Sequence, residues 1–240
     1  MRRAAVLLAF FALGLAPGSV LAQARRHRLV VAELFTAQGC VSCDKAEAGF
    51  AALAQKPGVI AVTLPVDYWD YLGWRDTFAQ PEFTDRQKAY ERRLGLRDVY
   101  TPQLIVNGAD QAPGDDPDAV DAVVAKARHA RAHGPEIRIR RDGRVEIGAE
   151  AGRRRGAEVW LMRFDPHLHA VEVKAGDNRG ATVADRNVVR QIVRLGTWSG
   201  DARGFKLPAA DQEGLASLIL VQGAHGGRIL AARVLTADKP

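Results

Sequence analysis

The two cysteines of this 240-residue chain, Cys40 and Cys43, stand three positions apart at a predicted junction between a strand and a helix. Residues 28–36 form a short, largely apolar run, which is typical of a strand buried on both faces. Residues 41–55 repeat apolar side chains at helical spacing, so a helix is expected to begin just after the first cysteine. A buried strand that runs directly into a helix favours an α/β fold built around this turn.

The segments that follow continue the alternation of strands and helices. Lys56-Pro57-Gly58 ends the first helix, and Asn107-Gly108 is a hairpin signal. The aspartates before Pro117 and the proline itself favour the start of another helix. The predicted elements are a strand at 59–66, a helix at 81–94, a strand at 103–106 and a helix at 117–129. This order is that of an α/β domain.

The sequence pattern changes near Gly134, where we place a domain boundary. Apolar and charged residues alternate on both sides of the turn at 141–143, which is typical of a β-hairpin. Residues 187–195 fit either a helix or a strand, and their β-rich surroundings favour a strand. Further predicted strands lie at 159–164, 170–173, 218–221 and 229–235. Residues 25–134 are therefore expected to form the α/β domain, and residues 135–240 a small antiparallel, sandwich-like β domain.

The first residues have the three-part pattern of a secretory signal peptide. Arg2 and Arg3 precede an apolar run at 4–15, and residues 16–24 are small and weakly polar. The apolar run is shorter than the ~20 residues that a membrane-spanning helix needs. We expect residues 1–24 to be removed, leaving a soluble periplasmic or secreted protein without a stable membrane anchor. A leader that stays attached as an anchor is the alternative.

The formal net charge of +6 does not indicate a nucleic-acid-binding protein. Two of these charges leave with the predicted leader, and the rest are spread thinly apart from Arg25-Arg26 and the triplet at 153–155. An arginine triplet between strand-like segments is typical of a solvated hairpin tip. We expect no nucleic-acid partner, because an exported protein does not meet nucleic acid in its compartment.

The position of Cys40 favours a reactive thiolate. The free backbone N–H groups and the partial positive charge at a helix N-terminus lower the pKa of a thiol below its usual ~8.5. One helical turn brings the sulfur of Cys43 close enough to attack a mixed disulfide formed at Cys40. This arrangement assigns nucleophilic attack to Cys40 and resolution to Cys43.

Three other interpretations of the cysteine pair remain open. An oxidising compartment permits a purely structural disulfide, although so small a ring contributes only ~2 kcal/mol by chain entropy. Zinc would need two further ligands, for which His167 with His169 or His129 with His133 are candidates. Such histidines are more often surface residues, so we expect no metal. The third interpretation is an inherited fold whose cysteines have no redox role.

A strand, a Cys-x-x-Cys pair that opens a helix, and a later Thr101-Pro102 before a strand together resemble the thioredoxin superfamily. The resemblance implies a cis Thr101-Pro102 bond that faces the cysteines, beside backbone that pairs with an extended substrate. A trans proline that starts a strand is the alternative. Glu33 stands near the place where thioredoxins keep a buried acid that relays a proton to the resolving cysteine. The alternative is an exposed glutamate at the end of a strand.

Four longer segments carry a finer resemblance: ELFTAQGCVSC at 33–43, VDYWDYLGW at 66–74, LGLRDVYTPQLIVNG at 94–108 and GDNRGATVADRNVVR at 176–190. They resemble a bacterial family of secreted, thioredoxin-like proteins, the domain of unknown function 1223 family. The chain departs from the family pattern at Asp44-Lys45, where two prolines are usual. A carboxylate beside the cysteines opposes thiolate formation, because like charges repel.

An aromatic and helical insertion is predicted between the second strand and Pro102. Residues 67–74 hold four of the chain's eight tryptophan and tyrosine residues. Aromatic side chains with polar edges suit a peptide-binding groove beside the thiols. A wedge that closes the interface between the two domains is the alternative. The candidate substrate-binding residues are Tyr68, Trp69, Tyr71 and Trp74.

The segment GDNRG at 176–180 is rich in residues that tolerate tight turns. Asp177 and Arg179 are its candidates for reaching the thiol domain or binding a partner, and a purely structural loop is the alternative.

Together these features predict a periplasmic thiol–disulfide oxidoreductase built on a thioredoxin-like domain. Cys40 and Cys43 are its expected catalytic pair, with Thr101, Pro102 and Glu33 beside them. Its expected partners are secreted or periplasmic proteins with thiols or disulfides, and no cofactor is expected. The alternative is a secreted, thioredoxin-like binding module without catalysis, whose disulfide is structural or regulatory.

Overall fold

A computed structural model of the chain describes residues 29–130, 134–140, 142–151 and 156–235. The predicted signal peptide at 1–24 and the arginine triplet at 153–155 lie outside the described residues. Within those described ranges, no helix is long and apolar enough to cross a membrane.

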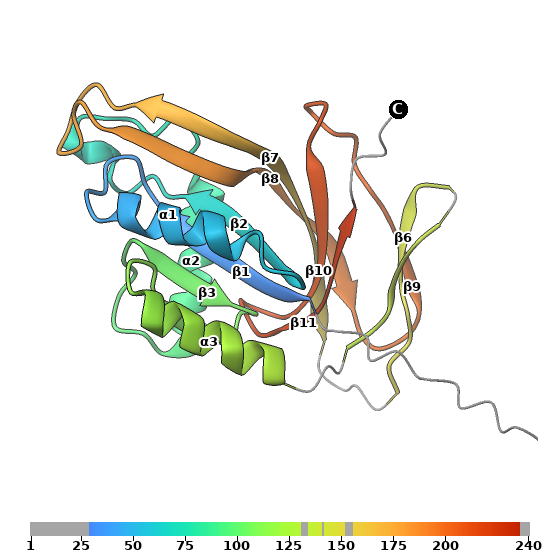
Figure 1. Cartoon of the computed structure of the whole chain (residues 1–240). Helices are drawn as coiled ribbons and strands as arrows, with labels where there is room; N and C mark the ends of the chain where they lie inside the picture. Colours follow the sequence, from blue (N-terminus) through green and yellow to red (C-terminus); the bar gives the residue numbers. More distant parts are fainter. Residues whose placement is uncertain (1–28, 131–133, 141, 152–155, 236–240) are drawn as a thin grey trace, which may run out of the picture.

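The first half of the chain forms the predicted alternation of strands and helices (Figure 1). Two helices begin with a proline in their first turn, and the Asp116 carboxylate accepts a hydrogen bond from Ala119 N at 3.1 Å, which caps the second of them. The elements are β1 (Val30–Thr36), α1 (Cys43–Leu53), β2 (Val59–Pro65), the short helix η1 (Asp70–Leu72), α2 (Pro81–Leu94), β3 (Gln103–Val106), β4 (Asp110–Pro113) and α3 (Pro117–His129). The predicted bounds of the helices at 81–94 and 117–129 and of the strand at 103–106 are confirmed.

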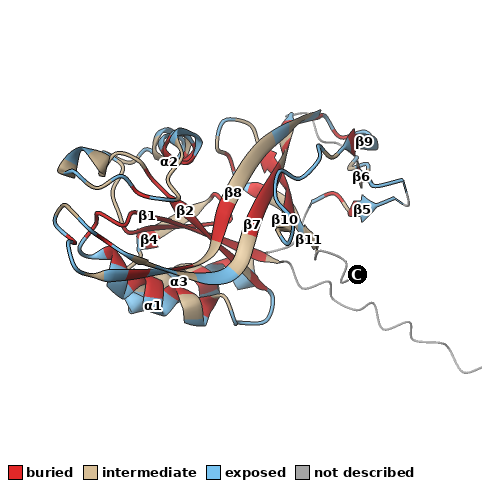
Figure 2. Cartoon of the chain, turned by 90° about the horizontal axis from the view of Figure 1, so that it is seen from above, coloured by how far each residue is buried: buried red, intermediate tan, exposed pale blue. Residues whose placement is uncertain are grey.

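Strand β1 lies at the centre of this half and is buried along its whole length. It pairs with β2 in parallel and with β3 in antiparallel orientation. Alternate residues of β1 enter two different cores, as its period of two requires. Ala32 and Leu34 pack with α1 and α3, whereas Val31 and Phe35 pack on the side of α2. The sheet is therefore covered on both faces (Figures 1 and 2).

The second half of the chain extends the same sheet. Its strands are β5 (Ile137–Ile139), β6 (Arg144–Ile147), β7 (Ala157–Glu172), β8 (Thr182–Trp198), β9 (Arg203–Lys206), β10 (Ala216–Gly223) and β11 (Ile229–Leu235). The large sheet has the order β11-β10-β7-β8-β2-β1-β3-β4, with β8 beside β2 in parallel at Thr63 and Val188. The predicted strand at 187–195 is confirmed as part of β8. The division into two domains near Gly134 stays a prediction, and one sheet contains strands from both sides of that point.

A small antiparallel sheet of order β5-β6-β9 packs against the far end of the large sheet. Its apolar residues Val145, Ile147 and Phe205 form one core with residues of β7, β8 and β10, including the fully buried Trp198. The protein is thus a mixed α/β structure with a large mixed sheet and a small antiparallel sheet.

The β7–β8 hairpin is the longest feature of the molecule and positions the site. We call its outer part, residues 168–185 with the connecting loop, the arm. Beyond the point where β8 meets β2, the arm crosses over the first turn of α1 (Figure 1). The backbone of β8 is fixed to β2 by Thr63 Oγ1, which donates to Arg186 O at 2.7 Å, and by Asn187 Nδ2, which donates to Ala61 O at 2.7 Å. Residues from both halves of the chain therefore meet at the cysteines.

Candidate functional site

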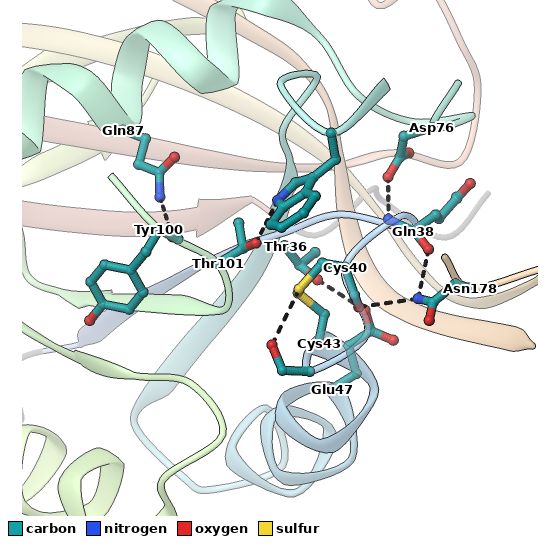
Figure 3. The surroundings of a disulfide bond; sticks show 12 residues. Thr36, Gln38, Cys40, Cys43, Glu47, Asp76, Gln87, Tyr100, Thr101 and Asn178 are labelled. Carbon is teal, nitrogen blue, oxygen red and sulfur yellow. Dashed lines mark hydrogen bonds between the residues drawn. A yellow bond between two sulfur atoms is a disulfide. The ribbon is translucent and has the colours of Figure 1, made fainter. Parts of the chain in front are cut away.

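Cys40 and Cys43 form a disulfide at the junction of β1 and α1 (Figure 3). Cys43 is the first residue of α1, and its N–H donates to Cys40 O at 3.1 Å. Both residues are buried, with 2% of Cys40 and none of Cys43 exposed. The helix begins at the second cysteine, two residues later than the sequence predicts. Cys40 therefore lies in the turn before the helix.

The Thr101-Pro102 peptide bond is cis, as the resemblance to the thioredoxin superfamily implies. Thr101 lies in the surroundings of the disulfide (Figure 3). Trp69 connects the two loops, because its Nε1 donates to Thr101 Oγ1 at 2.8 Å and its Cβ lies against Gly39. The segment before α1 and the loop before β3 are thus held together by one of the predicted aromatic residues.

The other residues of the aromatic segment have different surroundings. Trp74 Nε1 donates to Gln38 Oε1 at 3.0 Å, which also fixes the segment before the cysteines. Tyr68 packs against the core, and burial raises its pKa to about 12. Tyr71 is 79% exposed. Trp69 and Trp74 therefore position the cysteine loop, and substrate binding by the four residues stays a prediction.

Asp76 is a buried residue of the site that the sequence reasoning missed. Its carboxylate accepts hydrogen bonds from Gln38 N at 2.7 Å, Phe78 N at 2.9 Å and Ala79 N at 3.1 Å. Burial raises the pKa of Asp76, and these backbone bonds oppose the shift. Asp76 joins the segment before the cysteines to the start of the α2 region. The sequence signal that could have indicated Asp76 is its position directly after the aromatic segment at 67–74.

The arm closes over the cysteine loop through Asn178. Its Nδ2 donates to Gln38 O at 2.9 Å and to Cys40 O at 3.1 Å, and the side chain is buried (Figure 3). The GDNRG loop therefore reaches the cysteines, but not through the predicted residues. Asp177 and Arg179 are both exposed. The turn directs the side chain of Asn178, which lies between them, inward.

Replacing Asn178 by alanine is expected to speed reduction of the disulfide by dithiothreitol about fivefold to thirtyfold. Loss of two hydrogen bonds lowers the free energy needed to lift the arm by about 1–2 kcal/mol. The rate is measured by thiol release at fixed pH. The matched control is Asp177→Ala, which alters the exposed neighbour and should leave the rate unchanged. An unchanged rate in Asn178→Ala would show that the arm does not limit access to the sulfurs.

The structure confirms that Glu33 is buried and contradicts the exposed alternative. The residue is fully buried, so it is not an exposed strand-end glutamate. Its Oε1 accepts from Arg86 Nε at 2.6 Å and its Oε2 accepts from Tyr90 OH at 2.5 Å. Arg86 and Tyr90 also hydrogen-bond Gln222 of β10. Glu33 therefore forms a buried ion pair with Arg86 of α2. Both of its carboxylate oxygens are used by this helix, which does not fit a proton relay to Cys43.

A different acid lies beside Cys43. Glu47 follows it by one turn of α1, is 8% exposed, and accepts a hydrogen bond from Thr36 Oγ1 at 3.1 Å. Asp185 of the arm, which is 2% exposed, interacts electrostatically with Glu47. Burial raises the pKa of Glu47 to about 7, and it raises that of Asp185 well above its ordinary value, helped by repulsion from Glu47. The spacing from Cys43 could have indicated Glu47, but nothing local indicates Asp185.

Histidine pairs at 129 and 133 and at 167 and 169 were the candidates for zinc. In the described part of the chain, no group of three or more His, Cys, Asp or Glu side chains is arranged to hold a metal ion. His167 and His169 both lie near Asp165, with nitrogen–oxygen distances of 2.7 and 3.0 Å. His129 ends α3, and His133 lies outside the described residues.

Comparison with known proteins identifies a family. The family model described as "Protein of unknown function (DUF1223)" matches residues 31–222, which confirms the family predicted from the sequence motifs. None of the curated proteins matches the chain.

The solved structures that are similar to this chain include the following two. The crystal structure of protein AGR_C_4864 from Agrobacterium tumefaciens is 32% identical over 90% of this chain and 98% of that chain, with a TM-score of 0.72. HBP35 of Porphyromonas gingivalis is 17% identical over 89% of this chain and 76% of that chain, with a TM-score of 0.58. The second likeness concerns the fold alone.

Proposed function

The chain belongs to the DUF1223 family of proteins of unknown function, and we propose that it is a periplasmic thiol–disulfide oxidoreductase with a thioredoxin-like domain. The observation that carries the proposal is the disulfide between Cys40 and Cys43 at the turn from β1 to α1. The order β-α-β-α-β-β-α of residues 30–129, with the cis Thr101-Pro102 loop next to the cysteine loop, supports the thioredoxin-like assignment.

The proposed reaction is disulfide exchange with a client protein. A client thiolate attacks Cys40 Sγ, the bond between Cys40 and Cys43 breaks, and its electron pair leaves on Cys43 Sγ. A second client thiolate then attacks the client sulfur of the mixed disulfide and releases Cys40 as a thiolate. The client dithiol is oxidised and the cysteine pair is reduced; the reverse steps reduce a client disulfide.

Exposed apolar side chains between the cysteines and on the aromatic segment suit a protein client. Val41, between the cysteines, is 64% exposed, and Tyr71 on the aromatic segment is also open to solvent. Exposed apolar groups at a site favour contact with another protein rather than with a small polar molecule.

One observation favours the second candidate, a binding module with a structural disulfide. Both cysteines are buried under the arm, and Asn178 covers the backbone of Cys40. A disulfide that no thiol can reach does not undergo exchange, whatever its reduction potential. The two candidates differ in how readily the disulfide is reduced.

Equilibration of the protein with glutathione buffers tests the proposal. We expect half-reduction of Cys40 and Cys43 at a potential between about −120 mV, typical of an oxidant, and about −270 mV, typical of a reductant. Thiol labelling at each buffer ratio measures the reduced fraction. A potential below about −300 mV would instead identify a structural disulfide and support the binding module.

A further inference from the structure

We propose that a cavity between α2 and the strands of the second half of the chain binds an organic cation, an alkylammonium or alkylguanidinium group on an apolar stem. The cavity has a volume of about 350 Å³, within the range of about 300–1,000 Å³ that is typical of ligand sites. Its lining residues belong to α2, β7, β8, β10 and the turn that follows β10, not to the cysteine segment, the aromatic segment or the arm. The site is therefore independent of the proposed function.

The cavity lies under α2, which covers the side of the large sheet opposite α1 and α3 (Figure 2). Its most deeply buried lining residues, Arg86 and Gln222, form the floor. Arg86 donates to Glu33 Oε1 at 2.6 Å and to Gln222 Oε1 at 3.1 Å. The Glu33 carboxylate thus balances the charge of Arg86 inside the protein, and the network fixes the floor without a ligand.

The walls of the cavity offer an apolar surface. Trp160 and Ile192 line it from the sheet, and Ala89 lines it from α2. All three are partly buried rather than enclosed in the core. The turn of His225 and Gly226 closes one end, where a Cβ atom on Gly226 would lie only 2.9 Å from the backbone of Ala89. An apolar stem placed along these walls is removed from water, which favours binding.

The rim of the cavity carries negative charge that the protein leaves unbalanced. Glu82 and Asp85 are exposed and stand three residues apart on α2, so they lie on one face of the helix. Neither forms an ion pair with a described residue, whereas Glu158, the third carboxylate at the cavity, pairs with Arg194 at 3.0 Å. Two like charges one turn apart repel each other, so a cation near both is stabilised and an anion is disfavoured.

A balanced floor, apolar walls and an acidic rim together select the ligand. A bare cation gains little, because an exposed ion pair by itself contributes little. A neutral hydrocarbon leaves the rim carboxylates without a partner. A cation on a stem of about four methylene groups, as in lysine, uses both features, with the stem along Trp160 and the charge beside Glu82 and Asp85. A free amine and a basic side chain of a polypeptide share this chemistry.

Titration of the full chain with n-butylamine, followed by NMR of the tryptophan indole N–H groups, tests the proposal. The chain has four tryptophans, and the spectrum of Trp160→Phe identifies the signal of Trp160. This signal should shift with a Kd at or below about 5 mM at low salt. The signal of Trp198, which is fully buried in a different core, should not move.

Two further probes separate the contributions of charge and stem. Butyrate has a stem of similar length and the opposite charge, so it should bind at least about tenfold more weakly than n-butylamine. Methylamine keeps the charge and lacks most of the stem, and it should also bind at least about tenfold more weakly.

The double variant Glu82→Gln, Asp85→Asn should raise the Kd for n-butylamine at least about fivefold. Both positions are exposed, so the variant should keep the spectrum of the folded protein. The matched control is Asp118→Asn with Glu213→Gln, which removes two exposed carboxylates outside the cavity and should leave the Kd unchanged. High salt should weaken binding to the unmodified protein more than binding to the rim variant.

A capped tripeptide, acetyl-Gly-Lys-Gly amide, distinguishes the two sources of the cation. Binding at least as tight as that of n-butylamine would identify a basic side chain of a polypeptide, and weaker binding would identify a free amine; either result supports the cation site. Equal binding of butyrate and n-butylamine, an unmoved Trp160 signal, or an unchanged Kd in the rim variant would overturn the proposal.

Discussion

Cys43→Ser is expected to trap client proteins as mixed disulfides on Cys40, whereas Cys40→Ser is expected to trap few. Cys40 lies in the turn before α1 and is 2% exposed, whereas Cys43 is fully buried as the first residue of the helix, so we expect attack at Cys40. Without the resolving sulfur, the mixed disulfide persists. Non-reducing gel electrophoresis of proteins captured from a periplasmic extract, followed by reduction, measures the difference, which should be at least about tenfold.

The double variant Cys40→Ser, Cys43→Ser is the control and should trap nothing. Alkylation of the reduced protein at mildly acidic pH should label Cys40 well before Cys43. Equal labelling, together with equal trapping by the two single variants, would refute the catalytic assignment and favour the binding module.

Arg86→Met is expected to lower the free energy of unfolding by about 3–5 kcal/mol at pH 7. The variant leaves the fully buried Glu33 carboxylate without its cation, and breaking a buried ion pair on one side costs about this much. Arg86 also hydrogen-bonds Tyr90 and Gln222, so the network joins α2 to strands from both halves of the chain. Urea unfolding followed by tryptophan fluorescence measures the change.

Replacing both ionic partners provides the comparison. Arg86→Met with Glu33→Gln removes the uncompensated charge and should recover part of the lost stability, because a neutral buried pair avoids the cost of an isolated ion. Lys56→Met, which breaks an exposed ion pair with Asp121, should change stability by less than about 1 kcal/mol. A loss below about 1 kcal/mol in Arg86→Met would show that the buried pair does not hold the two halves together.

Local signals determined most of the first half of the fold. Pro81 and Pro117 start helices, Asp116 caps the second, and Gly95 ends the first in a left-handed conformation. Each of these effects acts between residues within one turn of the chain, so it can be predicted from the local sequence. The placement of the cysteines at the turn from β1 to α1 belongs to the same class of prediction. The cis Thr101-Pro102 bond was instead implied by the resemblance to the thioredoxin superfamily.

The partners of those residues depended on tertiary structure. The helix that packs on the same face of β1 decides whether Glu33 contacts solvent, a sulfur or Arg86. The residues next to Glu33 in the sequence do not indicate which helix packs there. The strand order was likewise not predicted, because any of several strands of the second half could have paired with β2.

The sequence by itself determined the cysteine pair, the strand and helix that flank it, and the family. Only the tertiary structure decided what surrounds the sulfurs. The register of β8 on β2, set by contacts near Val188, carries Asn178 and Asp185 of the arm to the first turn of α1. Pairing between strands distant in sequence is selected by the packing of the whole sheet, and a shift of one residue would turn these side chains away from the site.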